Sequence, residues 1–135
     1  VYGPWGRPDM AMMIFIRKIL ANQPIPVFNN GNMKRDFTYI DDIIAGTRAA
    51  IENNYKCEIF NLGNHRSENL MDMIKIIERE LGKEAILDFK PMQPGDVKES
   101  FADIKKSKQL LGYLPKIKII DGIPTVIDWY RKYYI

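Results

Sequence analysis

Arg7 lies in a short motif that could bind an anion. The tetrapeptide at 6–9, Gly-Arg-Pro-Asp, leads directly into the apolar run Met10–Ile16, which predicts a buried helix capped by Asp9. The unpaired amides and the dipole at such a helix start attract negative charge, and the forked guanidinium of an arginine adds to this attraction. The motif therefore predicts contact with a phosphate or a carboxylate.

A second segment places an aromatic ring and an arginine on either side of a polar turn. Phe28 ends a short apolar run at 25–28, and Arg35 follows the turn Asn29–Asn32. The turn predicts a hairpin that joins this run to a second strand at 36–40. An aromatic ring and an arginine on one hairpin could hold a base and a phosphate. Packing of Phe28 in the hydrophobic core is the alternative.

A third segment, Gln93-Pro94-Gly95-Asp96, is a rigid loop that ends in a carboxylate. The proline and the glycine predict a turn at this place. A carboxylate at the end of such a loop suits the two hydroxyl groups of a diol such as ribose. By itself the motif establishes only the turn.

The residue types of the common catalytic centres are scarce. His65 is the only histidine, which excludes a histidine-based metal cluster, and we expect it in a surface loop after a strand. Cys57 precedes that predicted strand, and we expect it to be a small apolar residue rather than a nucleophile. The neighbours Asp41 and Asp42 predict a helix cap rather than paired carboxylates for acid–base catalysis. We therefore predict neither a catalytic residue nor a metal site in these residues.

Composition and charge exclude other classes of protein. The 135 residues include 46% hydrophobic and 27% charged side chains, the balance of one globular domain with a hydrophobic core. The net charge of +3 is spread along the chain without a dense basic stripe, so we expect no nucleic-acid partner. The longest apolar run has seven residues, far short of a membrane span. A single cysteine suits a reducing compartment, and we expect a cytoplasmic protein.

Hydrophobic periodicity predicts an α/β fold with about five helices and mixed short strands. The helices are expected to begin at Met10, at Asp41 or Asp42, near Leu70, at Ile104 and at Asp121. The strands are expected at 25–28, 36–40, 58–62 and 85–89. No repeat or linker interrupts this alternation, so the whole chain is expected to form one α/β unit.

Three longer motifs follow one another along the chain. They are Val-Tyr-Gly-Pro-Trp-Gly-Arg-Pro-Asp-Met-Ala at 1–11, Lys-Arg-Asp-Phe-Thr-Tyr-Ile-Asp-Asp-Ile at 34–43 and Met-Gln-Pro-Gly-Asp-Val at 92–97. Together they resemble the extended short-chain dehydrogenase/reductase family, and most closely its NAD-dependent UDP-glucuronate 4-epimerases. Residues 102–115 are also similar to the tail of that family, so the resemblance covers the whole chain.

The resemblance implies a two-part enzyme, of which this sequence matches one part. Family members bind NAD on an amino-terminal Rossmann domain and a nucleotide sugar on a smaller carboxy-terminal region. A Tyr-x-x-x-Lys pair removes a proton from the sugar hydroxyl at carbon 4 while NAD takes the hydride, which then returns to the other face. That pair and the Gly-rich NAD fingerprint are both expected upstream of Val1. Residues 1–135 are therefore expected to form the nucleotide-sugar-binding region without the Rossmann half, and to be inactive alone.

The resemblance assigns roles near the start of the chain. Val1 and Tyr2 match the strand end that approaches the nicotinamide of NAD. Arg7 matches the arginine that faces the sugar acid or the diphosphate. Met10 and the amides that follow Asp9 match the phosphate-binding helix start. The expected partner is thus a UDP-sugar, with NAD as the cofactor of the complete enzyme and only weak binding of NAD to this chain.

Further roles fall on the second and third segments. Val27 and Phe28 match the segment that holds uracil, and Arg35 matches the arginine that pairs with the diphosphate through its fork. Asp96 matches the acid that grips the ribose. Gln93 occupies a position where many relatives outside the UDP-glucuronate subfamily have an arginine. The glutamine favours that subfamily but removes one expected phosphate contact.

Two alternatives to the epimerase remain from the sequence alone. One is a non-catalytic module for nucleotide-sugar binding or assembly. The other is part of a sibling UDP-glucuronate decarboxylase or nucleotide-sugar dehydratase. In each case the run Met10–Ile16 and the strand at 59–62 would be expected to pack on a Rossmann half. Without that half we expect exposed apolar surface and self-association, for example as a homodimer.

Overall fold

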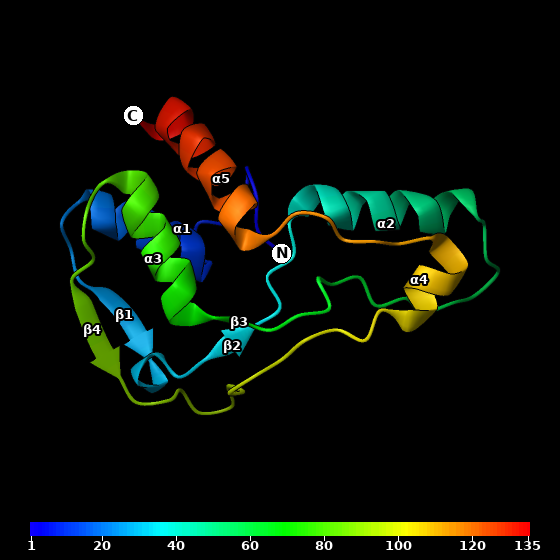
Figure 1. The fold of residues 1–135 in the computed structure, drawn as a ribbon, viewed down its shortest axis with the longest axis horizontal. Coiled ribbons are helices and arrows are strands. Elements are labelled where there is room, and N and C mark those ends of the chain that lie inside the picture. Colours follow the sequence, from blue (N-terminus) through cyan, green and yellow to red (C-terminus); the bar gives the residue numbers. More distant parts are fainter.

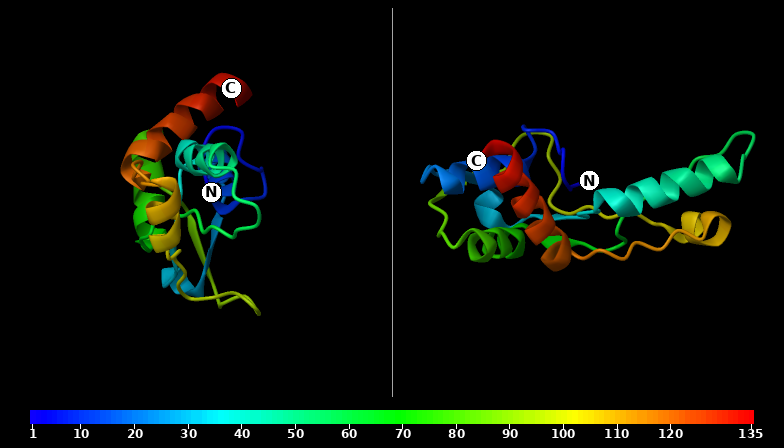
Figure 2. Two further views of the ribbon diagram at one scale, coloured as in Figure 1. Left: turned by 90° about the vertical axis from the view of Figure 1, so that its right-hand side faces the viewer. Right: turned by 90° about the horizontal axis from the view of Figure 1, so that it is seen from above.

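Two groups of elements lie along the longest axis of the protein in the computed structural model, which describes residues 1–135 (Figures 1 and 2). One group, here called the large lobe, contains α1, α3, α5 and the strands. The other, here called the arm, contains α2, α4 and the segments at 58–64 and 112–116. In chain order the elements are α1 (Ala11–Leu20), β1 (Ile25–Phe28), the 3₁₀ turn η1 (Asn29–Gly31), β2 (Lys34–Arg35), α2 (Ile40–Glu52), β3 (Glu68–Asn69), α3 (Leu70–Leu81), β4 (Leu87–Lys90), α4 (Lys105–Leu111) and α5 (Ile119–Tyr134).

The three helices of the large lobe bury their apolar faces against one another and against β1. The core is a cluster of 18 buried residues, most of them on these helices at helical spacing. In α3 the stripe contains Met73, Ile74 and Ile77, and the helix ends at Gly82, whose φ of +66° suits a left-handed C-cap. These helices confirm the predicted periodicity. No helix is both long and apolar enough to cross a membrane.

The start of α1 corrects two expectations. Met12, Met13 and Ile16 are buried within the large lobe, because α3 and β1 cover α1, so of the run Met10–Ile16 only Met10 and Ala11 are left exposed. Asp9 does not cap the helix: the N-cap position is Met10, without a side-chain hydrogen bond. The carboxylate of Asp9 pairs instead with the guanidinium of Arg7, with 3.2 Å between Nε and Oδ1.

The predicted hairpin is wrong, although the strand 25–28 and the turn after it are confirmed. β1 pairs in parallel with β4, with Ile25 opposite Leu87, and β2 pairs antiparallel with β3. The turn includes two asparagines with φ near +50° and a 3₁₀ segment, rather than the two-residue turn that returns a strand along its partner. The chain after the turn therefore does not run back along β1. Residues 36–40 form no strand, and Ile40 already begins α2.

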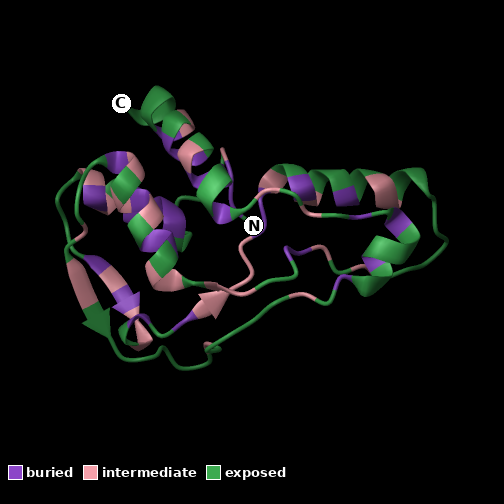
Figure 3. Ribbon diagram, in the orientation of Figure 1, coloured by how far each residue is buried: buried purple, intermediate pink, exposed green.

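α2 lies in the arm and buries a different face from the one its apolar stripe predicts (Figure 3). Its buried residues are Asp42 and Gly46, whereas Ile44 and Ile51 are exposed. Asp42 is not the helix cap. The helix begins at Ile40, and the Asp42 carboxylate accepts hydrogen bonds from the backbone N–H groups of 116 and 117 at 2.9–3.0 Å. This carboxylate attaches the chain before α5 to the arm.

The segment 58–62 is not the buried strand that its apolar residues predict. It has no secondary structure, and Ile59 is 82% exposed. A strand requires a neighbour to accept and donate its backbone hydrogen bonds, and no strand of this chain lies beside it. Cys57, just before it, is exposed rather than packed. The sequence pattern of a strand is therefore present without the sheet that would complete it.

Candidate functional site

Two cavities adjoin the first turn of α1. The first, here called the Asp96 cavity, has a volume of about 370 Å³, and the second, here called the Tyr2 cavity, about 290 Å³. Ala11, Arg35 and Phe37 line both of them, so the two cavities are adjacent and share a wall that includes Arg35. The first-turn amides of a helix have no intrahelical acceptors, which makes this region favourable for an anion.

The Asp96 cavity brings together residues from three separate segments of the chain. Phe28 comes from the end of β1, Arg35 from β2, and Gln93 and Asp96 from the loop after β4. Phe28 is half-buried and lines the cavity, and it is not among the 18 residues of the core. Four of the seven substrate residues predicted from the sequence thus share one cavity, although more than 60 residues separate Arg35 from Asp96 in the sequence.

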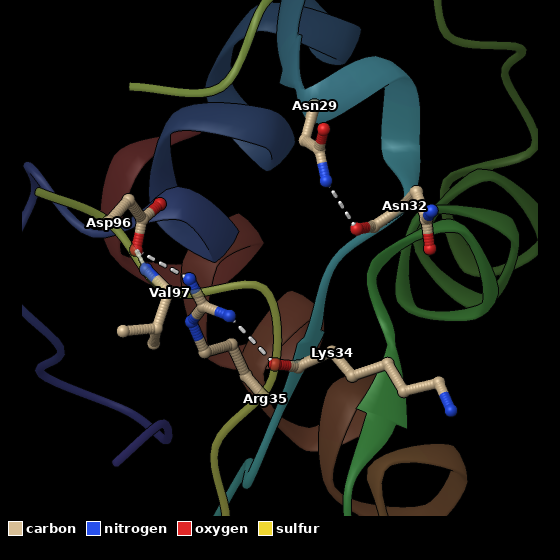
Figure 4. A network of polar contacts seen from close by, with 6 residues as sticks. All are labelled: Asn29, Asn32, Lys34, Arg35, Asp96 and Val97. Atoms are coloured by element: carbon tan, nitrogen blue, oxygen red, sulfur yellow. Dashed lines mark hydrogen bonds and ion pairs between the residues drawn. The ribbon is translucent and has the colours of Figure 1, made fainter. Parts of the chain in front are cut away.

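Arg35 and Asp96, which both line this cavity, form a hydrogen-bonded ion pair (Figure 4). The Arg35 Nη2 donates to Asp96 Oδ1 at 2.6 Å, and its Nη1 donates to the carbonyl of Lys34 at 2.7 Å. The same Oδ1 accepts the N–H of Val97 at 2.8 Å. The side chains are 27% and 33% exposed, so solvent reaches both. The Nε of Arg35 and the Oδ2 of Asp96 make no hydrogen bond within the chain, and both groups are therefore available to a ligand.

The Tyr2 cavity lies on the other side of Arg35. Val1, Tyr2 and Met10 line it, together with the loop glycines and Val126 of α5. Burial raises the pKa of Tyr2 well above its ordinary range, and the neighbouring Tyr39 and Asp42 raise it further. The hydroxyl, which an unperturbed tyrosine also keeps protonated at neutral pH, donates to the carbonyl of Lys118 at 3.2 Å. Tyr2 contributes shape and a neutral edge to this cavity rather than a proton acceptor.

Two of the predicted site residues line neither cavity. Arg7 is exposed and pairs with Asp9, which lines the Asp96 cavity. Val27 is fully buried in the core beneath α1 and α3, opposite Phe89 in the β1–β4 ladder. Among the residues that line the two cavities, Arg35 is the only cation.

Asp36 connects the region behind Arg35 to other parts of the chain, a role that its sequence motif does not predict. Its carboxylate accepts the backbone N–H groups of Asn64, His65 and Ala102 at 2.7–3.1 Å and the hydroxyl of Thr38 at 3.0 Å. It therefore ties the arm and the loop before α4 to the residue after Arg35. Its partners lie up to 66 residues away, so no local pattern could have identified it.

The remaining candidates for chemistry lie outside both cavities. His65 is exposed, and its Nδ1 lies 3.0 Å from the carbonyl of Ala102. Cys57 is in the arm. No group of three or more histidine, cysteine, aspartate or glutamate side chains could hold a metal ion. The two cavities contain one arginine, three carboxylates (Asp9, Asp36 and Asp96), aromatic rings and a helix start. The arginine and the helix start can bind an anionic group, and the free oxygen of Asp96 can accept a hydrogen bond from a hydroxyl group.

Residues 1–63 match the NAD dependent epimerase/dehydratase family. By sequence and by fold, the chain is related to this family. It is 48% identical over 132 residues to the uncharacterized protein MJ1055 of Methanocaldococcus jannaschii, and 41% identical over 133 residues to the UDP-glucuronate 4-epimerase of Thermodesulfobacterium geofontis. These alignments cover 98% of this chain but 40% and 41% of the relatives. The chain thus spans less than half the length of the curated relatives it matches.

Solved structures agree with this relation. The UDP-glucuronic acid 4-epimerase of Bacillus cereus, solved in complex with UDP-glucuronic acid and NAD, is 38% identical with a TM-score of 0.92. The superposition covers 98% of this chain and 43% of that enzyme. The UDP-glucose 4-epimerase of Thermotoga maritima, solved with UDP-glucose, is 29% identical with a TM-score of 0.88. The helices and short strands of this chain are those of the carboxy-terminal region of family members, which confirms the expected α/β fold class.

Proposed function

We propose that the chain is the nucleotide-sugar-binding region of an NAD-dependent epimerase that interconverts UDP-glucuronate and UDP-galacturonate. The observation that carries the proposal is the convergence of Phe28, Arg35, Gln93 and Asp96 on one cavity beside a helix start. Relatives with 38–41% identity are UDP-glucuronate 4-epimerases, and one of them was solved with UDP-glucuronic acid.

Three residues that line the Asp96 cavity suit different parts of a UDP-sugar. The ring edge of Phe28 suits the uracil, and the free Oδ2 of Asp96 suits a ribose hydroxyl. Arg35 would bind the diphosphate with its remaining donors, assisted by the first-turn amides of α1. The sugar would then extend into the Tyr2 cavity, because Arg35 lines both cavities and the diphosphate connects nucleoside and sugar.

NAD, when bound, supplies the hydride acceptor and donor at carbon 4. In this chain Val1 and Tyr2 are the residues proposed to lie nearest to it. Val1 is exposed, and the backbone of Tyr2 is held by hydrogen bonds with Thr38 and Ile40, so Val1 is accessible to a further structural element. We propose that the exposed face of α2 and the segment 58–62 contact a dinucleotide-binding half in the same way.

Titration of UDP into the chain by calorimetry tests the proposal. We expect Arg35→Ala to weaken UDP binding by roughly tenfold or more, since charged hydrogen bonds contribute about 1.5–3 kcal/mol. Arg35→Lys should restore only part of the affinity, because lysine keeps the charge but not the fork. Arg48→Ala is the matched control, since Arg48 is an exposed arginine on α2 that pairs with Glu52. Unchanged UDP affinity in Arg35→Ala, or no UDP binding at all, would overturn the proposal.

We also propose that these 135 residues do not catalyse the epimerisation alone. None of their tyrosines is followed four positions later by a lysine; Tyr55 is followed by Ile59 and Tyr130 by Tyr134. Incubation of the chain with NAD and UDP-glucuronate should therefore yield no UDP-galacturonate. Formation of product at an enzymatic rate would contradict this.

A further inference from the structure

The loop at 3–9 forms one wall of the Tyr2 cavity. Its glycines Gly3 and Gly6 line the cavity, and Val126 of α5 lines it from another side. The backbone hydrogen bonds of the loop are internal: Gly6 donates to Gly3 at 3.3 Å and Met10 donates to Arg7 at 3.2 Å. The second bond joins the loop to the N-cap of α1, and neither bond attaches the loop to α5.

Trp5 makes that attachment. Its indole lies against two aromatic rings of α5, with 5.3 Å between its centroid and that of Trp129 and 4.7 Å to that of Tyr133. Trp129 and Tyr133 are themselves stacked, with an angle of 14° between their planes. Edge-to-face and tilted contacts of this kind are favourable arrangements of aromatic rings. The loop is thus held to the helix that also supplies Val126.

The backbone conformation of Trp5 points to a role for its side chain. Its φ is +63°, a conformation that glycine adopts freely and a bulky residue rarely adopts. The side chain is also 70% exposed, so burial does not explain a tryptophan at this position. What the indole provides, and glycine would not, is the contact with Trp129 and Tyr133. Strained conformations of this kind persist where the surrounding structure determines them.

We propose that Trp5 is a positioning residue that fixes the loop 3–9 against α5 and so sets the wall of the Tyr2 cavity and the place of Arg7. The identity of the ligand in this inference rests on the proposed function. Trp5 acts on the sugar end of the ligand, because it holds the loop beside the Tyr2 cavity. The residues proposed to bind the uracil, the ribose and the diphosphate, Phe28, Asp96 and Arg35, belong to β1, β2 and the loop after β4, so Trp5 does not hold them in place. Of the loop 3–9, only Asp9 lines the Asp96 cavity.

The test compares the full chain with Trp5→Ala and Trp5→Phe, and uses Phe101→Ala as a control that removes another exposed aromatic ring outside both cavities. The first measurement is the backbone ¹⁵N order parameter of Gly6 and Arg7. We expect about 0.85 in the unsubstituted chain, in Trp5→Phe and in Phe101→Ala, and below about 0.6 in Trp5→Ala. An unchanged value in Trp5→Ala would overturn the inference, with or without a ligand.

The second measurement is the affinity for UDP-glucuronate and for UDP. Trp5→Ala should weaken UDP-glucuronate binding roughly tenfold or more, since misplacing a wall of the site is costly. It should change UDP binding by less than about twofold, as for a distant and independent site. A loosened loop with unchanged UDP-glucuronate affinity, or equal losses for both ligands, would refute the positioning role. Failure of the unsubstituted chain to bind UDP would refute the proposed function instead. The order parameters would still show whether Trp5 fixes the loop 3–9.

Discussion

Helices of the large lobe and helix α2 of the arm both have apolar residues at helical spacing, but these residues are buried in the large lobe and exposed in α2. In the large lobe, apolar residues at helical spacing lie in the core, and Ile74 and Ile127 are almost fully buried. In the arm, the apolar stripe of α2 faces outward, and Ile51 is 73% exposed. Periodicity therefore marks the face of a helix that is suited to burial. Whether that face is buried depends on whether another element of the chain reaches it.

The sharpest test of this comparison is to shorten one isoleucine in each region. We expect Ile74→Ala to lower the free energy of unfolding by roughly 2–5 kcal/mol, because it leaves a cavity in a closely packed core. Ile51→Ala should change it by less than about 0.5 kcal/mol. Urea denaturation monitored by circular dichroism measures both values. Similar losses for the two substitutions would show that the stripe of α2 is buried after all.

A second test detaches the arm. Asp42→Ala removes the carboxylate that accepts the N–H groups of 116 and 117 and leaves these groups without partners. Hydrogen bonds to charged groups contribute about 1.5–3 kcal/mol, so we expect the free energy needed to open the arm locally to fall by that amount. Amide hydrogen exchange should become faster in α2 and at 116–117 and stay unchanged in α3. Asp41→Ala, at an exposed position in the same turn, is the control. Equal acceleration in α3 would show that the two regions unfold together.

A third test uses pH at Tyr113, which forms a second, smaller hydrophobic cluster with the buried residues Ile104 and Leu111. The buried hydroxyl of Tyr113 donates to the carbonyl of Gly63 at 3.0 Å, and burial raises its pKa from 10.0 to about 12, with Asp42 and Asp36 adding to the effect. Below pH 10 this group contributes its full stabilisation. As the pH rises from 10 to 12 the unfolded state loses the proton first, so the stabilisation is lost.

Tyr113→Phe should therefore cost about 1 kcal/mol at neutral pH, and the difference from the unsubstituted chain should shrink above pH 10. Thermal unfolding at pH 8 and at pH 11 measures this difference. Tyr134→Phe, in which an exposed ring near the end of α5 loses its hydroxyl, is the comparison. A difference that stays constant with pH would contradict the assignment.

The smallest expected effect concerns association. The exposed apolar residues of the arm predict concentration-dependent self-association of the chain. Replacing Ile44 and Ile51 together by lysine should reduce the mass measured by light scattering toward that of one chain, with little change in stability. A single-chain mass for the unsubstituted protein at high concentration would contradict this prediction.

Local signals predicted the elements of the large lobe well and their partners poorly. The helix that ends at Gly82, the turn after Phe28 and the loop at 91–96 follow from capping and turn residues alone. The pairing of β1 with β4 does not, because the strands are about 60 residues apart and the turn suggested a nearer partner. The segment 58–62 has the sequence pattern of a strand but forms none, for the same reason. A pattern of apolar residues indicates which side chains could be buried, but not whether a neighbouring strand is present to pair with the backbone.

The sequence by itself determined the residue types of the site, the helical stripes and the resemblance to an epimerase family. The tertiary structure decided which of those residues meet. It placed Arg35 beside Asp96, left Arg7 paired with its neighbour Asp9, and gave Asp36 and Asp42 structural roles that their local sequence does not reveal. The physical reason is that capping and periodicity act over one or two turns of chain. A cavity and a buried carboxylate depend on groups that only folding brings together.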